Sequence, residues 1–575
     1  MAEKPQPGGE SWFIQITAFL AAVLGHLPAL GAFWNQDDWG LLSRAAGLLP
    51  APELPVRFLS QQLYWQILYP LFGLEPDPYT WTRLLLHGGC AVLVARIAAR
   101  GGLGSIGQLV ASLLFAASPL VFTPLYWASG VQELLGAFLA LAALDRWLAG
   151  GRRNLLLALV MGGCSVLAKE NGLGLPLLLA MILWRRRGVT AGERPLAWLV
   201  VSALTAITIG ECILVWRHFD TGIGTPYAVG SWFTPLGNLG MYGWWLLTPG
   251  PVFTAAFSPV MGFSGWALWL VWTAWSWLSW RRGNGWPAAC LCAALLSLAP
   301  CLVLVTHWYP YLALLAAAAG ALTIGQLVPR HWPFHPVTAL FLVVAAVSWS
   351  WIGMETRLKQ RDDSGLPADP LVLRTAVSYQ AVQNLKTLPA YPGGSVAPVI
   401  FLFQPPPSGP AAEYAETLGE NWIAGTLLYN ALDGLKGPRL VLPPELTVRW
   451  RNSLDTATET DFVLVDAGHG FRPWGQLPQA LLYLSLHEVA WGRFESAQRH
   501  LLRAASLSDD TMPFFYDRDL MLVTLRSLQA NATPFQEFLA DDSQPDPNGV
   551  LAQRRAALLE IFSELLVVCS EGIIR

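Results

Sequence analysis

Two adjacent carboxylates, Asp37 and Asp38, stand directly after the first long apolar run of the sequence. Carboxyl groups beside a hydrophobic boundary are costly unless they are hydrogen-bonded, paired or hydrated. A carboxylate whose pKa is tuned by burial and by charged neighbours can act as a general base toward a hydroxyl. Neighbouring residues of a helix face different directions, so only one aspartate need touch the reacting group. The alternative is an N-cap of a short amphipathic helix over 37–48, where both charges favour the helix dipole.

Other side chains that can bind anions or hydroxyls are spread along the first two thirds of the chain. They are Arg57, Arg83, His87, Glu133, Lys169, Glu170, His307, Tyr309 and Tyr311. Each also has a purely structural interpretation: an arginine near lipid extends to the headgroups, Lys169 and Glu170 can pair with each other, and His87 fits helix packing. Glu133 and Glu211 lie in apolar runs, where acids are functional candidates, although hydration at a helix end also explains them.

The composition surrounding these residues is that of a membrane protein. Of 575 residues, 54% are hydrophobic and 13% are charged, and the mean hydropathy is +0.42. Soluble domains carry about a quarter charged residues, so this composition excludes a soluble enzyme and a disordered chain. The net charge of -3 excludes a general nucleic-acid binder, which needs a basic excess to neutralise phosphates.

About eleven apolar runs are long enough to predict membrane-spanning helices. They cover residues 12–33, 79–99, 105–125, 127–149, 154–169, 173–187, 195–216, 264–280, 286–305, 309–328 and 334–352. The first run is expected to be retained, because no cleavage site follows it. We expect residues 225–260, which Pro and Gly interrupt, to be re-entrant or interfacial, and residues 51–78 to form an amphipathic segment on the outer membrane face.

The loops between these runs predict the orientation of the chain. Arginine-rich loops alternate with loops that are acidic or uncharged. The positive-inside rule places the arginine-rich loops in the cytoplasm, so the N-terminus is expected inside and the C-terminal region outside. All the polar candidates named above then share the extracytoplasmic side.

The composition changes after Trp351. Residues 356–475 predict a small extracytoplasmic α/β domain, with helices over 369–388 and 411–431 and strands over 396–403, 439–442 and 461–465. Residues 476–575 predict helices only, with the spacing of one tetratricopeptide-like unit at Leu484, Gly492, Ala497, Leu501 and Ala504. An unrelated helical hairpin explains this spacing equally well, and either one would offer a surface for packing or for a protein partner.

These motifs together resemble the multi-spanning GT-C glycosyltransferases over about residues 12–352. The shared features are an acidic pair after the first span (Asp37, Asp38), a Pro-bracketed interfacial helix (Arg57), a W-x-S-G element (127–130), a Lys-Glu turn (Lys169, Glu170) and a W-Y-x-Y element (308–311). The chain most resembles protein O-mannosyltransferase-like enzymes and their bacterial relatives with tetratricopeptide tails. It departs from them at His307, where family members often have an arginine that can contact a lipid phosphate.

The resemblance implies a GT-C-like catalytic domain over residues 1–355 in a bacterial plasma membrane. Such an enzyme takes a sugar from a polyprenyl-phosphate donor in the bilayer and transfers it to a protein or glycan acceptor on the extracytoplasmic face. By this resemblance, Asp37 is the general base, and Asp38 orients it or binds the acceptor.

The same resemblance assigns the phosphate ligands. Arg57 and Lys169 are the best candidates, because charge-assisted bonds stabilise a phosphate leaving group. Arg83, His87 and His307 are weaker candidates. Carboxylates also suit Mg²⁺, but the resemblance implies no metal and no cofactor. The sequence contains neither a P-loop nor a dinucleotide fingerprint, which argues against an ATP-driven pump.

Two other classes of function fit part of the sequence. A secondary transporter would explain the intramembrane charges and the interrupted stretch at 225–260, but transporters of that type usually contain two similar halves, and no internal repeat is visible. A non-catalytic scaffold would explain the helical tail, but it leaves the gathering of polar residues on one side to chance.

Overall fold

The apolar runs form helices in the computed structural model, as they must in lipid, where the backbone has to satisfy its own hydrogen bonds. The structure describes residues 9–184, 190–219, 227–248, 259–306, 309–332, 334–363, 365–386, 399–404, 426–458, 461–468 and 470–490, with isolated positions among 221–225, at 423 and among 493–507. The chain divides into two compact units, residues 1–375 and 376–575. The boundary falls inside helix α16 (Pro370–Lys386).

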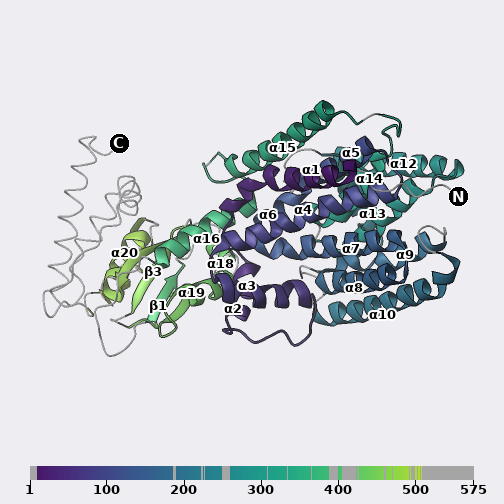
Figure 1. The fold of residues 1–575 in the computed structure, drawn as a ribbon. Coiled ribbons are helices and arrows are strands. Elements are labelled where there is room, and N and C mark those ends of the chain that lie inside the picture. The colour runs from purple at the N-terminus through teal and green to yellow at the C-terminus, as the bar shows by residue number, and fades with distance from the viewer. Residues whose placement is uncertain are drawn as a thin grey trace, which may run out of the picture. The chain divides into compact units, whose positions relative to one another are not determined.

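The first unit consists of helices, and Figure 1 shows the long ones lying side by side. The helices of ten or more residues are α1 (Gly9–Gly25), α4 (Pro76–Arg100), α5 (Ser105–Ala116), α7 (Val131–Ala149), α8 (Arg152–Ala168), α9 (Leu175–Trp184), α10 (Arg194–His218), α11 (Thr234–Leu247), α12 (Pro259–Arg281), α13 (Trp286–Leu302), α14 (Leu314–Gly325) and α15 (Pro336–Lys359).

Short helical segments connect the long helices. They are η1 (Leu27–Gly31), α2 (Asp37–Ala45), the π-helix η2 (Phe58–Leu63), α3 (Tyr64–Phe72), η3 (Pro119–Val121), α6 (Phe122–Tyr126), η4 (Ala128–Gly130), η5 (Glu170–Gly172), η6 (Ala191–Glu193) and η7 (Pro310–Ala313). Most of the polar candidates lie in or beside these short segments. Their side chains are therefore placed by breaks between long helices rather than by helix interiors.

Six helices in the described part of the chain are long and apolar enough to cross a membrane, as expected of a multi-pass helical membrane protein. They cover Ser11–Gly31, Pro76–Arg100, Ser105–Tyr126, Ala128–Ala149, Ala191–His218 and Pro336–Lys359. The predicted count of about eleven spans does not agree with this. Three further apolar helices, Glu170–Trp184, Trp286–Leu302 and Pro310–Gly325, have 10–17 residues, whereas a span needs about 20.

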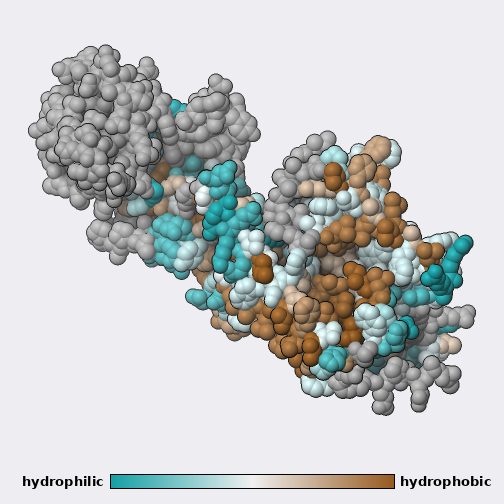
Figure 2. Space-filling view, turned by 90° about the horizontal axis from the view of Figure 1, so that it is seen from above, coloured by the Kyte–Doolittle hydropathy of each residue, from teal (hydrophilic) through white to brown (hydrophobic). Residues whose placement is uncertain are grey.

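The outer surface of this unit is apolar, as a lipid-facing surface would be. Leu199 on α10, Phe263 on α12 and Phe341 on α15 are 63%, 76% and 71% exposed. Figure 2 shows hydrophobic residues gathered on the face of the molecule that is seen there. A surface of this extent in water would favour aggregation, so its natural environment is the bilayer.

A four-stranded sheet and short helices form the described part of the second unit. The strands are β1 (Val399–Phe403), β2 (Thr447–Arg451), β3 (Phe462–Asp466) and β4 (Phe471–Gln476), and the helices after β1 are α18 (Leu427–Ala431), α19 (Lys436–Val441) and α20 (Leu477–Ala490). The sheet order is β2-β1-β3-β4, with β1 parallel to β2 and β3, and β4 antiparallel to β3. Alternate residues such as Phe401, Val463 and Trp474 form its core.

Two of the three predicted strands are confirmed. The predicted strands at 396–403 and 461–465 correspond to β1 and β3, and the helix over 369–388 corresponds to α16. The strand predicted at 439–442 is wrong, because most of this run belongs to helix α19. Gly492, Ala497 and Leu501 lie outside the described residues, as do 508–575 and most of 411–431, so the tetratricopeptide unit remains a prediction.

Candidate functional site

The two aspartates open helix α2, and they differ completely in exposure. Asp38 is fully buried, whereas Asp37 is exposed. The apolar face of the helix, with Trp39 and Leu42 buried, fixes this difference, because consecutive helical side chains point about 100° apart. Gln36, which precedes them, has φ 49° and ψ -126°, a backbone conformation that residues other than glycine rarely adopt.

Both oxygens of Asp38 are occupied by hydrogen bonds. Ser129 donates to Oδ1 from its backbone N–H at 2.7 Å and from its hydroxyl at 2.5 Å, and the backbone N–H of Asn35 donates to Oδ2 at 3.0 Å. Ser129 belongs to the W-x-S-G element, so this element and the aspartate pair, distant in sequence, are directly joined. Asp38 therefore fixes the start of α2, and its carboxylate is not accessible to solvent.

The pKa of Asp38 reflects its burial. Burial raises it to about 7, although hydrogen bonds from Ser129 and Asn35 and the positive charge of Arg83 lower it. Arg83 is also buried, and it donates to the carbonyl oxygen of Leu125 at 3.0 Å and to the hydroxyl of Thr80 at 2.8 Å. Arg83 thus supports Asp38 electrostatically from within helix α4.

An aromatic group borders the aspartates. Tyr309 and Tyr311 stack with their ring centroids 5.5 Å apart, and Trp127 meets the Tyr311 ring edge-on at 6.4 Å. Tyr311 lies within electrostatic range of both Asp37 and Glu133. The late aromatic motif is therefore part of the same site as the acidic pair.

Arg374 is a cation of this site that the sequence analysis missed. It lies in the first turns of α16, within electrostatic range of Asp37, Tyr309 and Tyr311. Its neighbour Thr375 accepts a hydrogen bond from the Asn35 amide at 3.2 Å, which ties this turn to the aspartate loop. The Nε of Arg374 is buried and has no hydrogen-bond partner among the described residues. We call Asp37, Asp38, Ser129, Tyr311 and Arg374 the aspartate site.

The start of α16 is anchored independently. Asp369 caps the helix by accepting the backbone N–H of Leu371 at 2.9 Å, and its other oxygen binds the Arg357 guanidinium of α15 at 2.9 Å. The guanidinium lies over the Phe122 ring, 3.6 Å from its centroid. This packing holds the turn that carries Arg374.

A second group of polar residues, the ion-pair cluster, consists of Arg57, Glu133, Lys169, Glu170 and Glu211. Arg57 Nε binds Glu170 at 2.6 Å, and Lys169 Nζ lies 3.1 Å from Glu133 and 3.6 Å from Glu170. Glu211 accepts the backbone N–H of Arg57 at 3.3 Å. All five are buried, so both predicted phosphate ligands already have anionic partners.

The backbone around Arg57 is specialised for this arrangement. Arg57 has φ 51° and ψ 38°, in the left-handed region, and it precedes the π-helix η2. The Ser60 hydroxyl of η2 donates to the carbonyl of Ala168, the last residue of α8, at 2.6 Å. This bond fixes η2 against the turn that carries Lys169 and Glu170.

Glu170 titrates far from its ordinary range. Burial raises its pKa, but the charges of Arg57 and Lys169 outweigh burial and bring the pKa to about 2. Glu170 is therefore ionised at every physiological pH. The sequence-level alternative, in which Lys169 and Glu170 simply pair, holds only in part, because each also binds a residue distant in sequence.

Two predicted ligands lie elsewhere or outside the described residues. His87 Nε2 is 3.0 Å from the carbonyl of Ala116, and its ring packs edge-on against His26 with the centroids 5.0 Å apart. This contact is helix packing, the structural alternative for His87. His307 and Trp308 lie outside the described residues. Gln132 and Asn171, which bind Arg57 and Glu133 at 3.3 and 2.6 Å, are polar partners that follow the W-x-S-G element and the Lys-Glu turn in the sequence.

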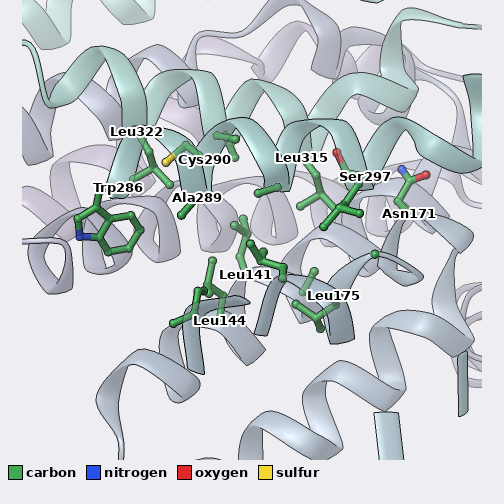
Figure 3. Close-up of a pocket in the computed structure, with 18 residues that line it drawn as sticks. Leu141, Leu144, Asn171, Leu175, Trp286, Ala289, Cys290, Ser297, Leu315 and Leu322 are labelled. Atoms are coloured by element: carbon green, nitrogen blue, oxygen red, sulfur yellow. The ribbon is translucent and has the colours of Figure 1, made fainter. Parts of the chain in front are cut away.

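A narrow apolar cavity ends at the ion-pair cluster. It lies between α7, α9, α13 and α14, and Figure 3 shows Asn171 and Ser297 toward one end and Trp286 at the other. Its volume of about 70 Å³ holds only a few water-sized molecules. It is therefore too small for a sugar or for an isoprenoid chain.

A much larger apolar groove lies near the aspartate site. It has a volume of about 780 Å³ and is lined by α5, η3, α11, α12, α14 and α15. Ser118, Pro119 and Leu120 form part of the wall, and their segment η3 contacts η7, which carries Tyr311. The groove thus adjoins the aromatic border of the aspartate site.

No group of three or more His, Cys, Asp or Glu side chains is placed to hold a metal ion within the described ranges. Neither the models of known protein families nor the curated proteins match this chain.

Proposed function

We propose that the chain is a membrane glycosyltransferase that moves a sugar from a polyprenyl-phosphate donor to a hydroxyl acceptor on the extracytoplasmic face. The observation that carries the proposal is the pairing of an exposed carboxylate, Asp37, with a buried one, Asp38, whose hydrogen bonds fix the helix start beneath it. A general base needs both features, because it must reach its substrate and hold one position.

In the proposed reaction, two groups of the aspartate site, Asp37 and Arg374, act on the substrates. The acceptor oxygen attacks the anomeric carbon of the donor sugar while its proton passes to Asp37. The bond between that carbon and the phosphate oxygen breaks, and the phosphate leaves with the electron pair. Arg374 is the cation of this site that stabilises the developing phosphate charge.

The role of the ion-pair cluster is different in this proposal. Arg57 and Lys169 already bind glutamates, so they would contact phosphate only after exchanging partners. In the arrangement seen here they position the turn at Lys169 and Glu170 next to η2.

The apolar groove supports a lipid-linked donor. A polyprenyl chain needs an apolar channel that adjoins the reacting groups, and the groove of about 780 Å³ borders η3 beside the aspartate site. The lipid-facing helices and the positive-inside rule support a multi-pass chain with this site and the C-terminal region outside the cytoplasm.

The first test replaces Asp37 by Asn and measures sugar transfer in membranes supplied with a radiolabelled undecaprenyl-phosphate hexose, and the intact mass of surface glycans and glycoproteins in cells. Loss of a general base lowers the rate about 10²- to 10⁴-fold. Asp77→Asn is the matched control, because Asp77 is an exposed acid at the first turn of α4 on the same predicted side. Unchanged transfer in Asp37→Asn would leave the scaffold as the better interpretation.

The second test blocks the groove at Gly320 on α14. A Cβ there would meet only the Trp272 ring, at 3.9 Å, so Gly320→Leu adds its side chain inside the groove without moving the backbone. We expect kcat/KM for the lipid-linked donor to fall about tenfold. Gly210→Leu on α10, where a Cβ meets nothing within 4 Å, is the control. Equal rates in both variants would contradict a donor chain in this groove.

A further inference from the structure

Three arginines converge on one buried carboxylate at the end of the bundle opposite the aspartate site. Asp145, in the last turns of α7, is fully buried. Arg100 Nε lies 2.6 Å from it, and Arg96 and Arg146 each place an Nη2 at 2.9 and 3.0 Å. Asp145 follows Glu133 by twelve residues on α7, which corresponds to about 18 Å along the helix.

The charges of this group do not balance. Three guanidinium groups and one carboxylate leave a net charge of +2, while a single arginine would neutralise Asp145. The bonds to Asp145 use one or two of the five N–H donors of each guanidinium. The arginine side chains are 30–32% exposed, so further donors reach the surface.

Helix dipoles explain the arginines only in part. Arg96 and Arg100 lie near the C-terminus of α4 and Arg146 near that of α7, where cations are favoured. A dipole does not require three guanidinium groups to share one buried acid. Asp145 instead holds like charges together, and an anion between them would relieve their repulsion.

The position of the group indicates which anion is available there. Arg100 ends the candidate span Pro76–Arg100, and Arg146 lies three residues before the end of Ala128–Ala149, so their side chains reach headgroup depth. Arg330 lies at the same end, with its guanidinium 3.6 Å from where a Cβ of Gly102 would be. The positive-inside rule puts this end in the cytoplasmic leaflet, where anionic lipids are attracted to basic side chains.

We propose that Arg96, Arg100 and Arg146, organised by Asp145, bind the phosphate of an anionic phospholipid headgroup. Arginine suits this ligand because its planar fork can bind two phosphate oxygens at once. The proposal does not depend on the function proposed above, since it concerns the opposite end of the bundle and a different ligand.

The test uses the full-length chain in nanodiscs or detergent. The probes are phosphatidylglycerol, zwitterionic phosphatidylcholine and inorganic phosphate, and the readouts are bound lipid by native mass spectrometry and the lipid-dependent rise of Tm. We expect phosphatidylglycerol alone to be retained and to raise Tm. Arg146→Gln, which leaves Asp145 with two arginine partners, should weaken retention about fivefold.

The control and the contrary outcomes are specific. Arg282→Gln removes an exposed arginine just beyond α12, on the same predicted side, and should leave lipid retention unchanged. Arg96→Gln provides a second variant if Arg146→Gln fails to fold. Equal loss of lipid retention in Arg282→Gln would mean that a diffuse basic surface binds the lipid. An equal rise of Tm with inorganic phosphate would mean a site for free anions. Equal retention of phosphatidylcholine and phosphatidylglycerol would mean that the group is only a structural ion pair. Each of these results would overturn the proposal.

Discussion

The aspartate site and the ion-pair cluster are built from similar residues but differ in what they expose. In the ion-pair cluster, each cation is bound to a glutamate and all five members are buried. In the aspartate site, one carboxylate is buried and fully bonded so that its neighbour Asp37 can stay exposed. The two groups therefore differ in accessibility rather than in charge, and only the aspartate site presents a carboxylate at the surface that a buried neighbour holds in place.

The largest effect on stability is expected in the ion-pair cluster. Arg57→Ala leaves Glu170 with Lys169 as its remaining cation, at 3.6 Å, and should lower the free energy of unfolding by about 3–5 kcal/mol. Unfolding can be followed by tryptophan fluorescence in detergent. Arg44→Ala, at an exposed arginine of α2, should change stability by less than about 0.5 kcal/mol.

A double variant separates charge from packing in this cluster. If Arg57→Ala is destabilising because it leaves the buried charge of Glu170 uncompensated, the double variant Arg57→Met with Glu170→Met should recover most of the stability lost in Arg57→Ala. Apolar pairs of similar volume replace buried ion pairs well. Equal stability of Arg57→Ala and Arg44→Ala would show that the cluster is not a structural core.

The next effect concerns the pH dependence of stability. Asp38 has a pKa of about 7 in the fold against an ordinary value of 3.8, so the folded chain holds this proton more tightly. Its contribution is therefore fully present below about pH 4 and is lost as the pH rises through 7. The difference is on the order of 4 kcal/mol at most. Asp38→Asn should flatten the Tm profile between about pH 4 and 7, and Asp37→Asn should not. A steep profile in Asp38→Asn would contradict the assignment.

A smaller effect is expected at Ser129. Its hydroxyl lowers the pKa of Asp38, so Ser129→Ala should move the same pH midpoint upward by about one pH unit and cost about 1–2 kcal/mol. Ser165→Ala removes a comparable buried hydroxyl, which donates to the Gly136 carbonyl at 2.8 Å, and should lower stability without moving the midpoint. A shift of the midpoint in both variants would refute a specific link between Ser129 and Asp38.

The smallest effect on stability is expected for Asp37→Asn, and this variant distinguishes the aspartate site from the ion-pair cluster most clearly. Asp37→Asn should leave the free energy of unfolding within about 0.5 kcal/mol of the original chain while it lowers the transfer rate about 10²- to 10⁴-fold. A large loss of stability in this variant would make Asp37 a structural residue like those of the ion-pair cluster.

The sequence predicted the parts of this molecule that local patterns encode. The helix after the acidic pair, the helical membrane character, and strands β1 and β3 follow from hydrophobic periodicity and from residues near in sequence. The count of spans failed because hydropathy does not show where a helix breaks, as it does at η5, between the 17-residue α8 and the 10-residue α9. Residues 439–442 are short and apolar, and such runs fit a helix as well as a strand.

The contacts that the sequence could not reveal are long-range ones. Arg374 reaches the aspartate site from a helix more than three hundred residues further along the chain, in a stretch that reads as an ordinary soluble helix. Glu211, which the sequence marks only as an acid in an apolar run, joins Arg57 across 154 residues. Nothing in the spacing of either residue indicates its partner, so only the fold brings them to the site.

The backbone of Gln36 has a consequence for how this molecule could be altered. A glycine at this position would adopt φ 49° and ψ -126° at little cost, and the chain would gain stability from the exchange. The same glycine would also make the loop before Asp37 more flexible, so the carboxylate would hold one position for a smaller fraction of the time. Under the proposed reaction, Gln36→Gly should therefore raise Tm and lower the transfer rate, so thermal stability and activity would be opposed at this one residue.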